Sequence, residues 1–332
     1  MRKRGTVKPI DRRSLIAAAG VLAGAGLIGS SPARARAYPQ RPVKLIVPYP
    51  AGGGTDVLAR LLAQKIEGEF SQPIVIDNRA GGASLIGTRA VSDSPADGYT
   101  IGVVDSAFVT NPSLFKDNIP YDTRKDFTPV SLLTRTQLVL SVLSSSKFNT
   151  AQELVAYGKA NELSLATGNA SGVVMSETLA RQVGWQKLLR VPFKSNPQAM
   201  TEVIAGRVQS MFTDIAAASA QLKAGTLRPI VVTSKQRSAL MPDLPTIAET
   251  AVADYDLSGW IGLFAPAGTP RPIVEKLNAE VTKALSAPDV RQKLLDLGAE
   301  PSPMAVNDYA AWVQQEVNKW TKLVKEAGIQ PE

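Results

Sequence analysis

VKLIVPYPAGGGTDVLARLL, residues 43–62, is the stretch that decides the fold. Its first five residues are β-prone, and its apolar residues after Asp56 recur at helical spacing. The glycines 52–54 stand between this strand and helix, where they permit close ligand approach that side chains would block. Thr55 or Asp56 is expected to cap the helix, and the remaining free N–H groups at its start suit an anion. The loop therefore predicts a binding site for a group such as a carboxylate.

The loop matches neither of two common nucleotide-binding motifs. Gly52-x-Gly54 begins like the dinucleotide fingerprint, but Val57 stands where its third glycine belongs. Gly-Lys-Ser/Thr occurs nowhere in the chain, so the nucleotide P-loop is excluded as well. The alternative to an anion site is that the glycines only form a tight turn.

Short β-branched runs continue to alternate with amphipathic stretches along the rest of the chain. This rhythm predicts an α/β fold with mostly parallel sheets. Strands are expected at 43–47, 74–76, 101–104, 163–166, 189–192, 208–212 and 227–233. Helices are expected from about 84 and at about 173–183, 197–205, 215–223, 271–286, 288–297 and 306–326.

Two extended segments interrupt this rhythm, at 130–143 and 260–264. We expect the chain to cross from one lobe to another in the first segment and to return in the second. The predicted lobes are residues 38–140 plus 262–332, which form a discontinuous lobe 1, and residues 141–261, which form lobe 2. Two hinge strands would let the lobes open and close around a ligand cleft.

Residues 1–37 have the pattern of an export signal. A basic start is followed by an apolar stretch at 15–28 and by small residues that end at Ala37, the expected cleavage site. The pair Arg12-Arg13 leaves the Sec and twin-arginine routes equally open. The signal predicts a periplasmic protein.

The composition excludes several classes of function. The chain has no His and no Cys, which removes zinc clusters, disulfides, Ser-His-Asp triads and lipid-modified cysteine anchors. The expected signal holds eight of the 37 basic residues and one of the 29 acidic residues, so the remainder carries 29 and 28 and is nearly neutral. Net charge therefore gives no reason to expect binding to nucleic acid or to an anionic membrane surface. Apart from the signal, no apolar run is long enough to span a bilayer.

Small and polar residues also follow other predicted strands. Gly81 and Gly82 precede a helix in a second glycine-containing loop, and Ser106 follows the third strand. In lobe 2 the stretch 167–172, TGNASG, and the pair Thr213-Asp214 occupy similar positions. The alternatives are that 167–172 is a polar capping turn and that Thr213-Asp214 only caps the helix from Ile215.

The ordered set of motifs resembles the Bug family of periplasmic receptors, the solute-binding components of tripartite tricarboxylate transporters. The resemblance spans nearly all of 38–332. It rests on motifs at residues 38–44, 47–56, 77–79, 96–100, 111–114, 121–122, 125–127, 233–237, 244–246 and 265–270.

The resemblance implies a two-lobed periplasmic binding protein fold of the type with two hinge strands. It implies a receptor for a mono-, di- or tricarboxylate, an amino acid or an aromatic acid, whose carboxylate is held largely by backbone amides and ordered water at the two glycine-rich loops. Together with the strand-end residues, the expected ligand-binding set is Tyr49, Pro50, Gly52, Gly53, Thr55, Asp56, Asn78, Gly81, Gly82, Ser106, Thr167, Asn169, Ser171, Thr213 and Asp214.

Lobe 2 departs from the family pattern. Residues 173–175, VVM, stand where similar proteins often carry a His, and Thr213-Asp214 replaces the usual Asp-Asn. We infer that this wall is less polar and suits a ligand with an apolar body.

The expected protein is a monomer without cofactor or metal that meets membrane subunits transiently. The alternatives are a co-sensor for a two-component system and a secreted carboxylate-processing enzyme with Asp56 or Asp214 as its base.

Overall fold

The structure is a computed structural model, which describes residues 38–168, 170–193, 196–326 and 328. The expected export signal lies outside the described residues. Every helix and strand named below belongs to one compact unit, Arg41–Glu332.

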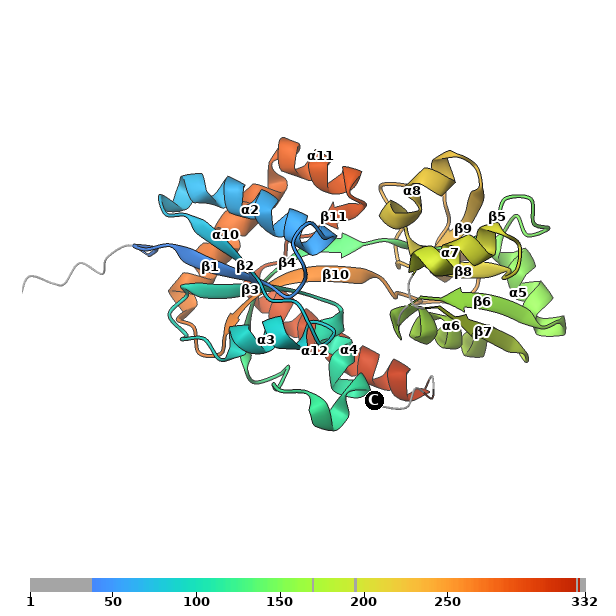
Figure 1. The fold of residues 1–332 in the computed structure, drawn as a ribbon, viewed down its shortest axis with the longest axis horizontal. Coiled ribbons are helices and arrows are strands. Elements are labelled where there is room, and N and C mark those ends of the chain that lie inside the picture. Colours follow the sequence, from blue (N-terminus) through green and yellow to red (C-terminus); the bar gives the residue numbers. More distant parts are fainter. Residues whose placement is uncertain (1–37, 169, 194–195, 327, 329–332) are drawn as a thin grey trace, which may run out of the picture. The chain divides into compact units, whose positions relative to one another are not determined.

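The first sheet has six strands in the order β11-β4-β10-β3-β1-β2 (Figure 1). β1 is parallel to β2 and to β3, whereas β10 runs antiparallel to β3 and β4, and β11 runs antiparallel to β4. The bounds are β1 Val43–Val47, β2 Ile74–Asn78, β3 Thr100–Asp105, β4 Phe127–Thr136, β10 Gly259–Pro266 and β11 Ala299–Pro301. Parallel strands buried on both faces explain the nearly continuous apolar run of β1.

Helices cover both faces of this sheet. α2, α10 and α11 lie together on one face, and α3, α4 and α12 lie on the other (Figure 1). The bounds are α2 Gly54–Phe70, α3 Leu85–Ser92, α4 Ala107–Leu114, the short 3-10 turn η1 Lys116–Asn118, α10 Arg271–Ser286, α11 Pro288–Asp296 and α12 Val306–Glu326.

The second sheet has five strands in the order β7-β6-β8-β5-β9. β6 is parallel to β7 and β8, and β5 runs antiparallel to β8 and β9. α7 and α8 cover one face and α6 covers the other (Figure 1). The bounds are β5 Leu138–Leu143, α5 Ala151–Ala160, β6 Leu163–Thr167, α6 Ala170–Val183, β7 Leu188–Pro192, α7 Asn196–Ile204, β8 Ser210–Asp214, α8 Ile215–Lys223, β9 Leu227–Val232 and α9 Ile247–Thr250.

Aromatic side chains form the centre of the core on the α12 side of the first sheet. Phe108 meets Phe127 edge to face at a centroid distance of 5.0 Å and meets Phe264 at 4.7 Å. Tyr309 of α12 packs on Phe264, with their ring centroids 5.4 Å apart. A Cβ at Gly262 would lie 1.8 Å from the hydroxyl oxygen of Tyr309, so this position has room only for glycine. Burying each such ring stabilises the fold by roughly 1.5–3 kcal/mol.

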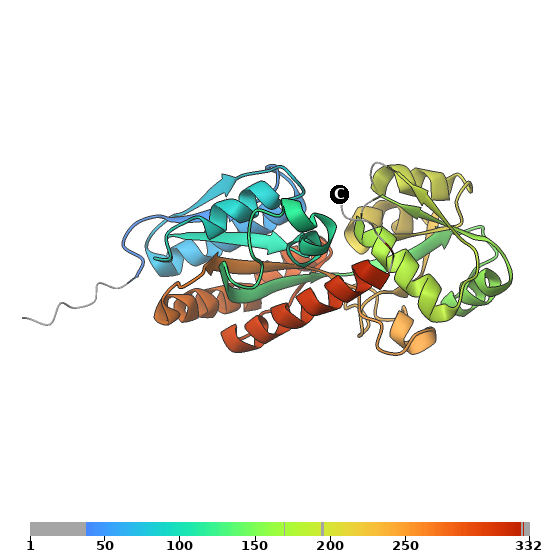
Figure 2. The same cartoon turned by 90° about the horizontal axis from the view of Figure 1, so that it is seen from below.

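α12 connects the parts of the molecule that carry the two sheets. It packs on α4 and β4 of the first sheet and on α6 of the second, and Figure 2 shows its long course. Arg181 of α6 forms an ion pair with Glu326 at the end of α12.

The chain passes from the first sheet to the second at Gln137 and returns through β10. The segment 130–143, expected as one extended crossing, is two strands that belong to different sheets, β4 and β5. Gln137 lies between them, and its carbonyl oxygen accepts a hydrogen bond from the N–H of Ile215 at 3.0 Å. The lobe boundaries near 140 and 262 remain a prediction.

The expected cap of α2 was wrong. The helix begins at Gly54 with Gly53 as its N-cap, and no side chain caps it. Asp56 lies in the first turn, where its carboxylate turns back toward the loop instead of capping the helix. α4, α5 and β11 were not predicted from the sequence.

Candidate functional site

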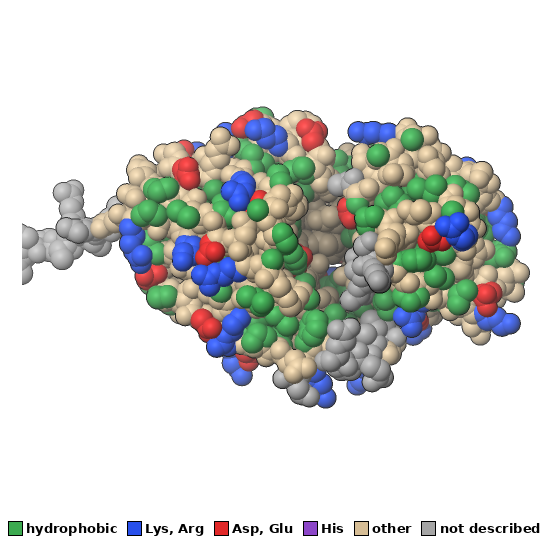
Figure 3. Space-filling model, viewed as in Figure 1, with side chains coloured by type: hydrophobic (Ala, Val, Ile, Leu, Met, Phe, Trp, Pro, Cys, Tyr) green, Lys and Arg blue, Asp and Glu red, His purple; other side chains and the backbone are tan. Residues whose placement is uncertain are grey.

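A cavity of about 620 Å³ lies where elements of both sheets meet, and we call it the large cavity. Its volume is in the range of pockets that hold small ligands. The first sheet's part of the chain contributes the start of α2, the β3–α4 junction and the end of α11. The second sheet's part contributes α6, the start of α7 and the cap of α8. In Figure 3 the surface is hollowed between these two parts.

The carboxylate of Asp56 fixes the conformation of the glycine loop, residues 52–54, through hydrogen bonds. One oxygen of its carboxylate, Oδ2, accepts hydrogen bonds from the N–H of Gly52 and from Nε of Arg60, each at 2.8 Å. The other, Oδ1, accepts from Nδ2 of Asn78 at 2.9 Å, and Asn78 also donates to the carbonyl of Tyr49 at 3.0 Å. Asp56 is only 1% exposed, and these partners, with Arg60 foremost, lower the pKa of its carboxyl to about 2.

This network leaves the start of α2 free to meet a ligand. Gly52 adopts φ +85°, in the left-handed region, which lets its N–H point back to Asp56. Gly54 and Thr55 line the large cavity, and a Cβ at Gly54 would have no neighbour within 4 Å. The first N–H groups of a helix have no intrahelical acceptor, so this wall offers backbone donors.

Tyr49 supports the neighbouring wall of the cavity. Its hydroxyl donates to Oδ2 of Asp105 at 2.6 Å, and the N–H of Ala107 donates to Oδ1 of the same carboxylate at 2.9 Å. Burial raises the pKa of Asp105 and, together with the negative charge of Asp105, raises the pKa of Tyr49. Asp105 and the adjacent Ser106 line the large cavity, whereas Tyr49 does not.

The second glycine-containing loop lies outside the lining of the large cavity. Gly81 and Gly82 have positive φ values of +131° and +55°, and the turn continues with left-handed residues at 83 and 84. Asn111 donates from Nδ2 to the carbonyl of Ala83 at 2.9 Å. α3, which follows, packs closely against the first loop, because a Cβ at Gly87 would lie 2.6 Å from Pro48.

The opposite wall comes from three helices near the second sheet. Ser171 and Met175 of α6 and Asn196 of α7 line the cavity. Asp214 lines it as well and also caps α8, since its Oδ1 accepts from the N–H of Ala217 at 2.8 Å. Asp214 therefore caps α8, as expected, and it also lies at the wall of the large cavity.

Four residues of the expected binding set line the large cavity: Thr55, Ser106, Ser171 and Asp214. Most of the others lie in or beneath the supporting loops, and Asn169 lies outside the described residues. Thr167 and Thr213 are buried at strand ends, at 3% and 0% exposure. The cavity-lining residues that the sequence did not suggest include Asp105, Leu138, Asn196, Trp260, Asp296 and Leu297, whereas Met175 belongs to the stretch 173–175 that was expected in the lobe 2 wall.

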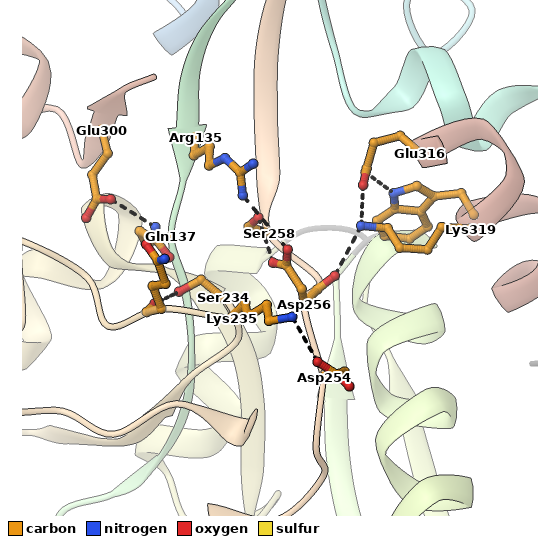
Figure 4. Close-up of polar contacts among 12 residues, drawn as sticks. Arg135, Gln137, Ser234, Lys235, Asp254, Asp256, Ser258, Glu300, Glu316 and Lys319 are labelled. Carbon is orange, nitrogen blue, oxygen red and sulfur yellow. Dashed lines mark hydrogen bonds and ion pairs between the residues drawn. The ribbon is translucent and has the colours of Figure 1, made fainter. Parts of the chain in front are cut away.

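A second cavity, of about 430 Å³, lies on the other side of the crossing strands, and we call it the charged cavity. Arg135 and Gln137 line it, whereas Thr136 and Leu138 line the large cavity, as alternation along an extended segment requires. Figure 4 shows the polar side chains of this region converging on the crossing segments.

Glu300 of β11 joins three parts of the chain at the charged cavity. Its Oε1 accepts from the hydroxyl of Ser238 at 2.7 Å and from the N–H of Ala239 at 2.8 Å. Its Oε2 accepts from Nε2 of Gln137 at 3.1 Å (Figure 4). Nearby, Arg135 faces Asp256 at 3.8 Å.

The described residues contain no group of three acidic side chains placed to hold a metal ion. Within the same part of the chain, no helix has the length and apolar character needed to cross a bilayer.

Comparison with known proteins assigns the family. The model of the "Tripartite tricarboxylate transporter family receptor" matches residues 58–329. Protein BugT of Bordetella pertussis is 32% identical over 320 residues, which cover 95% of this chain and 97% of BugT. The structure of the periplasmic binding protein BugD is similar, with 32% identity, a TM-score of 0.70 and coverage of 89% of this chain and 100% of BugD.

A further solved structure is that of Rpa4515 from R. palustris with adipate. It is 34% identical, with a TM-score of 0.74, and the match covers 89% of this chain and all of that one. These similarities confirm the expected fold class, an α/β periplasmic binding protein with two lobes. The chain therefore belongs to the tripartite tricarboxylate transporter receptor family, the Bug family of solute-binding proteins, which are receptors and not enzymes.

Proposed function

We propose that this protein captures a small organic carboxylate in the large cavity and presents it to the membrane subunits of a tripartite transporter. The observation that carries the proposal is the uncapped start of α2 in the cavity wall. A helix N-terminus without a side-chain cap attracts an anion through its free N–H groups and its dipole. α2 has 17 residues, which is long enough for a developed dipole.

The local structure supports a carboxylate as the anion. Gly54 leaves the backbone open to the cavity, so a small planar group reaches the amides without a steric obstacle. Asp56 is buried and fully engaged by Gly52, Arg60 and Asn78, so it shapes the loop instead of repelling the ligand from the surface. The related Rpa4515 was solved with adipate, which is a carboxylate of suitable size.

The proposed mechanism is closure of two lobes, residues 38–140 plus 262–332 and residues 141–261. A ligand that contacts both walls of the large cavity binds the closed state better and shifts the equilibrium toward it. The closed form would then be recognised in the periplasm by the transporter. We propose export through a signal cleaved near Ala37.

A substitution at Gly54 tests the site. In Gly54→Val the side chain enters open space in front of the α2 amides, so we expect affinity for the cognate acid to fall at least 100-fold, about 2.7 kcal/mol. Gly68→Val is the matched control, since Gly68 lies on the same helix, has nothing within 4 Å of its Cβ position and is not part of the cavity.

The ligand is found by native mass spectrometry of freshly purified protein and by a thermal-shift panel of organic acids. Titration calorimetry then compares the two variants with the unmodified protein. We expect both variants to melt at similar temperatures and only Gly54→Val to lose binding. Unchanged affinity in folded Gly54→Val would contradict the proposed site.

A further inference from the structure

One side of α12 lies along the two segments by which the chain passes between the sheets. Its residues recur at helical spacing and are Trp312, Glu316, Lys319 and Trp320. Trp312 lies beneath Arg135 of β4, whose guanidinium carbon is 5.5 Å from the ring centroid. The same indole meets Trp260 of β10 edge to face at a centroid distance of 5.2 Å. α12 therefore contacts the strand before the first crossing and the strand after the return.

Glu316 is the anionic centre of this side of α12. The residue is 5% exposed, and its Oε2 accepts a hydrogen bond from Nε1 of Trp320 at 3.1 Å. Its Oε1 forms an ion pair with Nζ of Lys319 (Figure 4). A buried carboxylate costs free energy unless its charge is paired and hydrogen-bonded. The position of Glu316 therefore fixes the positions of Lys319 and Trp320.

Lys319 connects α12 to the return segment, residues 255–260. Its Nζ donates to the carbonyl of Asp256 at 3.2 Å (Figure 4). The N–H of Leu257 donates to the carbonyl of Thr233 at 3.1 Å, and the N–H of Thr233 donates to the carbonyl of Leu138 at 3.0 Å. The hydrogen bonds thus continue from α12 through the return segment to the first crossing.

Stability alone gives little reason for a buried ion pair at this place. Apolar side chains of similar volume often stabilise a fold as well as a buried ion pair does. An ion pair, however, holds its partners in one geometry. α12 packs on α4 and β4 of the first sheet and on α6 of the second, so a fixed geometry here limits how the parts that carry the two sheets rotate against each other.

We propose that Glu316 and Lys319 are positioning residues of the hinge, which hold α12 on the return segment and so restrain both crossings. The inference rests on the proposed closure of two lobes, and it adds α12 as a third connection beside the two hinge strands. Trp320 and Leu138, at the two ends of the series, both line the large cavity. The restraint therefore acts on two parts of the cavity wall.

Hydrogen exchange of the ligand-free protein, measured by mass spectrometry, tests the restraint. The double variant Glu316→Gln/Lys319→Met removes the ion pair, while the glutamine still offers an acceptor to Trp320. A hydrogen bond from a charged donor favours the arrangement that contains it by about ten-fold or more in population. We expect amides of residues 134–139 and 255–260 to exchange about ten-fold faster. The midpoint of urea unfolding should stay close to that of the unmodified protein, because no unpaired charge is left in the interior.

Arg124→Gln is the matched control. Arg124 donates to Gln314 at 2.6 Å and to Asn318 at 2.7 Å, on the opposite side of α12. Its loss should leave the exchange of both crossings unchanged. If the double variant exchanged faster throughout the protein or only within α12, the ion pair would have a packing role and the inference would be overturned. Unchanged exchange at residues 134–139 would overturn it as well.

Glu316→Gln alone is a milder variant that should fold even if the double variant does not. It keeps an acceptor for Trp320, and it leaves Lys319, whose side chain is 31% exposed, in contact with solvent. We expect a smaller rise in exchange at the same two segments. No rise at either segment would contradict the role of Glu316.

The exchange measurement needs no ligand, so its outcome is separate from that of the proposed function. Faster exchange at both crossings in a protein that binds no organic acid would support the role of α12 and contradict the carboxylate receptor. Unchanged exchange in a protein whose acid binding is abolished by Gly54→Val would refute the role of α12 and leave the receptor intact.

Discussion

The substitution Asp56→Asn removes the charge that organises the glycine loop. Asparagine has nearly the same shape, but its amide cannot accept from Gly52, Arg60 and Asn78 together as the carboxylate does. We expect a lower free energy of unfolding and weaker ligand binding, because Gly52 and the start of α2 lose their fixed geometry.

The lowered pKa gives the magnitude and its pH dependence. A shift from 3.8 to about 2 stabilises the folded state by about 2.4 kcal/mol at neutral pH. Because the folded pKa is lower than the unfolded pKa, this contribution is complete above about pH 5 and is lost as the pH falls. It should decline to about 1.3 kcal/mol at pH 3 and to about 0.4 kcal/mol at pH 2.

Urea unfolding of the unmodified protein and of Asp56→Asn at pH 7 and pH 3 measures this contribution. The difference between the two proteins should shrink by about half at the lower pH. Asp296→Asn, which removes an exposed carboxylate, should show almost no difference at either pH. A difference for Asp56→Asn that is equal at both pH values would show that its charge does not stabilise the loop.

Two further substitutions probe the packing beside the glycine loop and the hydrogen bonds at the charged cavity. Gly87→Ala places a methyl 2.6 Å from backbone and side-chain atoms of Pro48, so we expect a loss of about 1–3 kcal/mol in thermal unfolding. Gly68→Ala, in open space on a helix, should instead be neutral or stabilising by up to about 1 kcal/mol, and equal effects would contradict the close packing. Glu300→Ala leaves Ser238 without its acceptor and should cost about 1.5–3 kcal/mol in urea unfolding, more than Glu300→Gln, which retains an acceptor; equal losses would argue against the hydrogen-bonding role.

Many helices and strands could be predicted from the spacing of apolar residues, but the point at which one β-prone run divides into two strands could not. α10 and α12 have the expected bounds, because their apolar residues recur at helical spacing over many turns. The β-prone run 130–143 gave no sign that Gln137 separates two strands of different sheets. That break depends on which partners each half finds, and those partners are far away in the sequence.

The glycine loop was expected at a ligand cleft, and its last glycine does line the large cavity; the residues of the opposite wall were only partly predictable. Asp56 was expected near the helix start, but its bond to Asn78 depends on how β1 and β2 lie side by side, and its bond to Gly52 depends on the left-handed turn at that glycine. Asn196 and Asp296 reach the cavity through the packing of α7 and α11, which no local motif records. The expected membrane partners and the export route remain predictions.

Along residues 135–138, alternate side chains face the large cavity and the charged cavity, which offers a way to measure ligand binding. Adjacent residues of one short segment face two different cavities, so we expect a rotation that closes the large cavity to displace the lining of the charged cavity as well. The chain contains no cysteine, and Ser302 lines the charged cavity, not the large cavity in which we propose that the ligand binds. A single thiol introduced at this position would be the only one in the protein, so we expect an attached fluorophore to report on ligand binding from outside the proposed binding site.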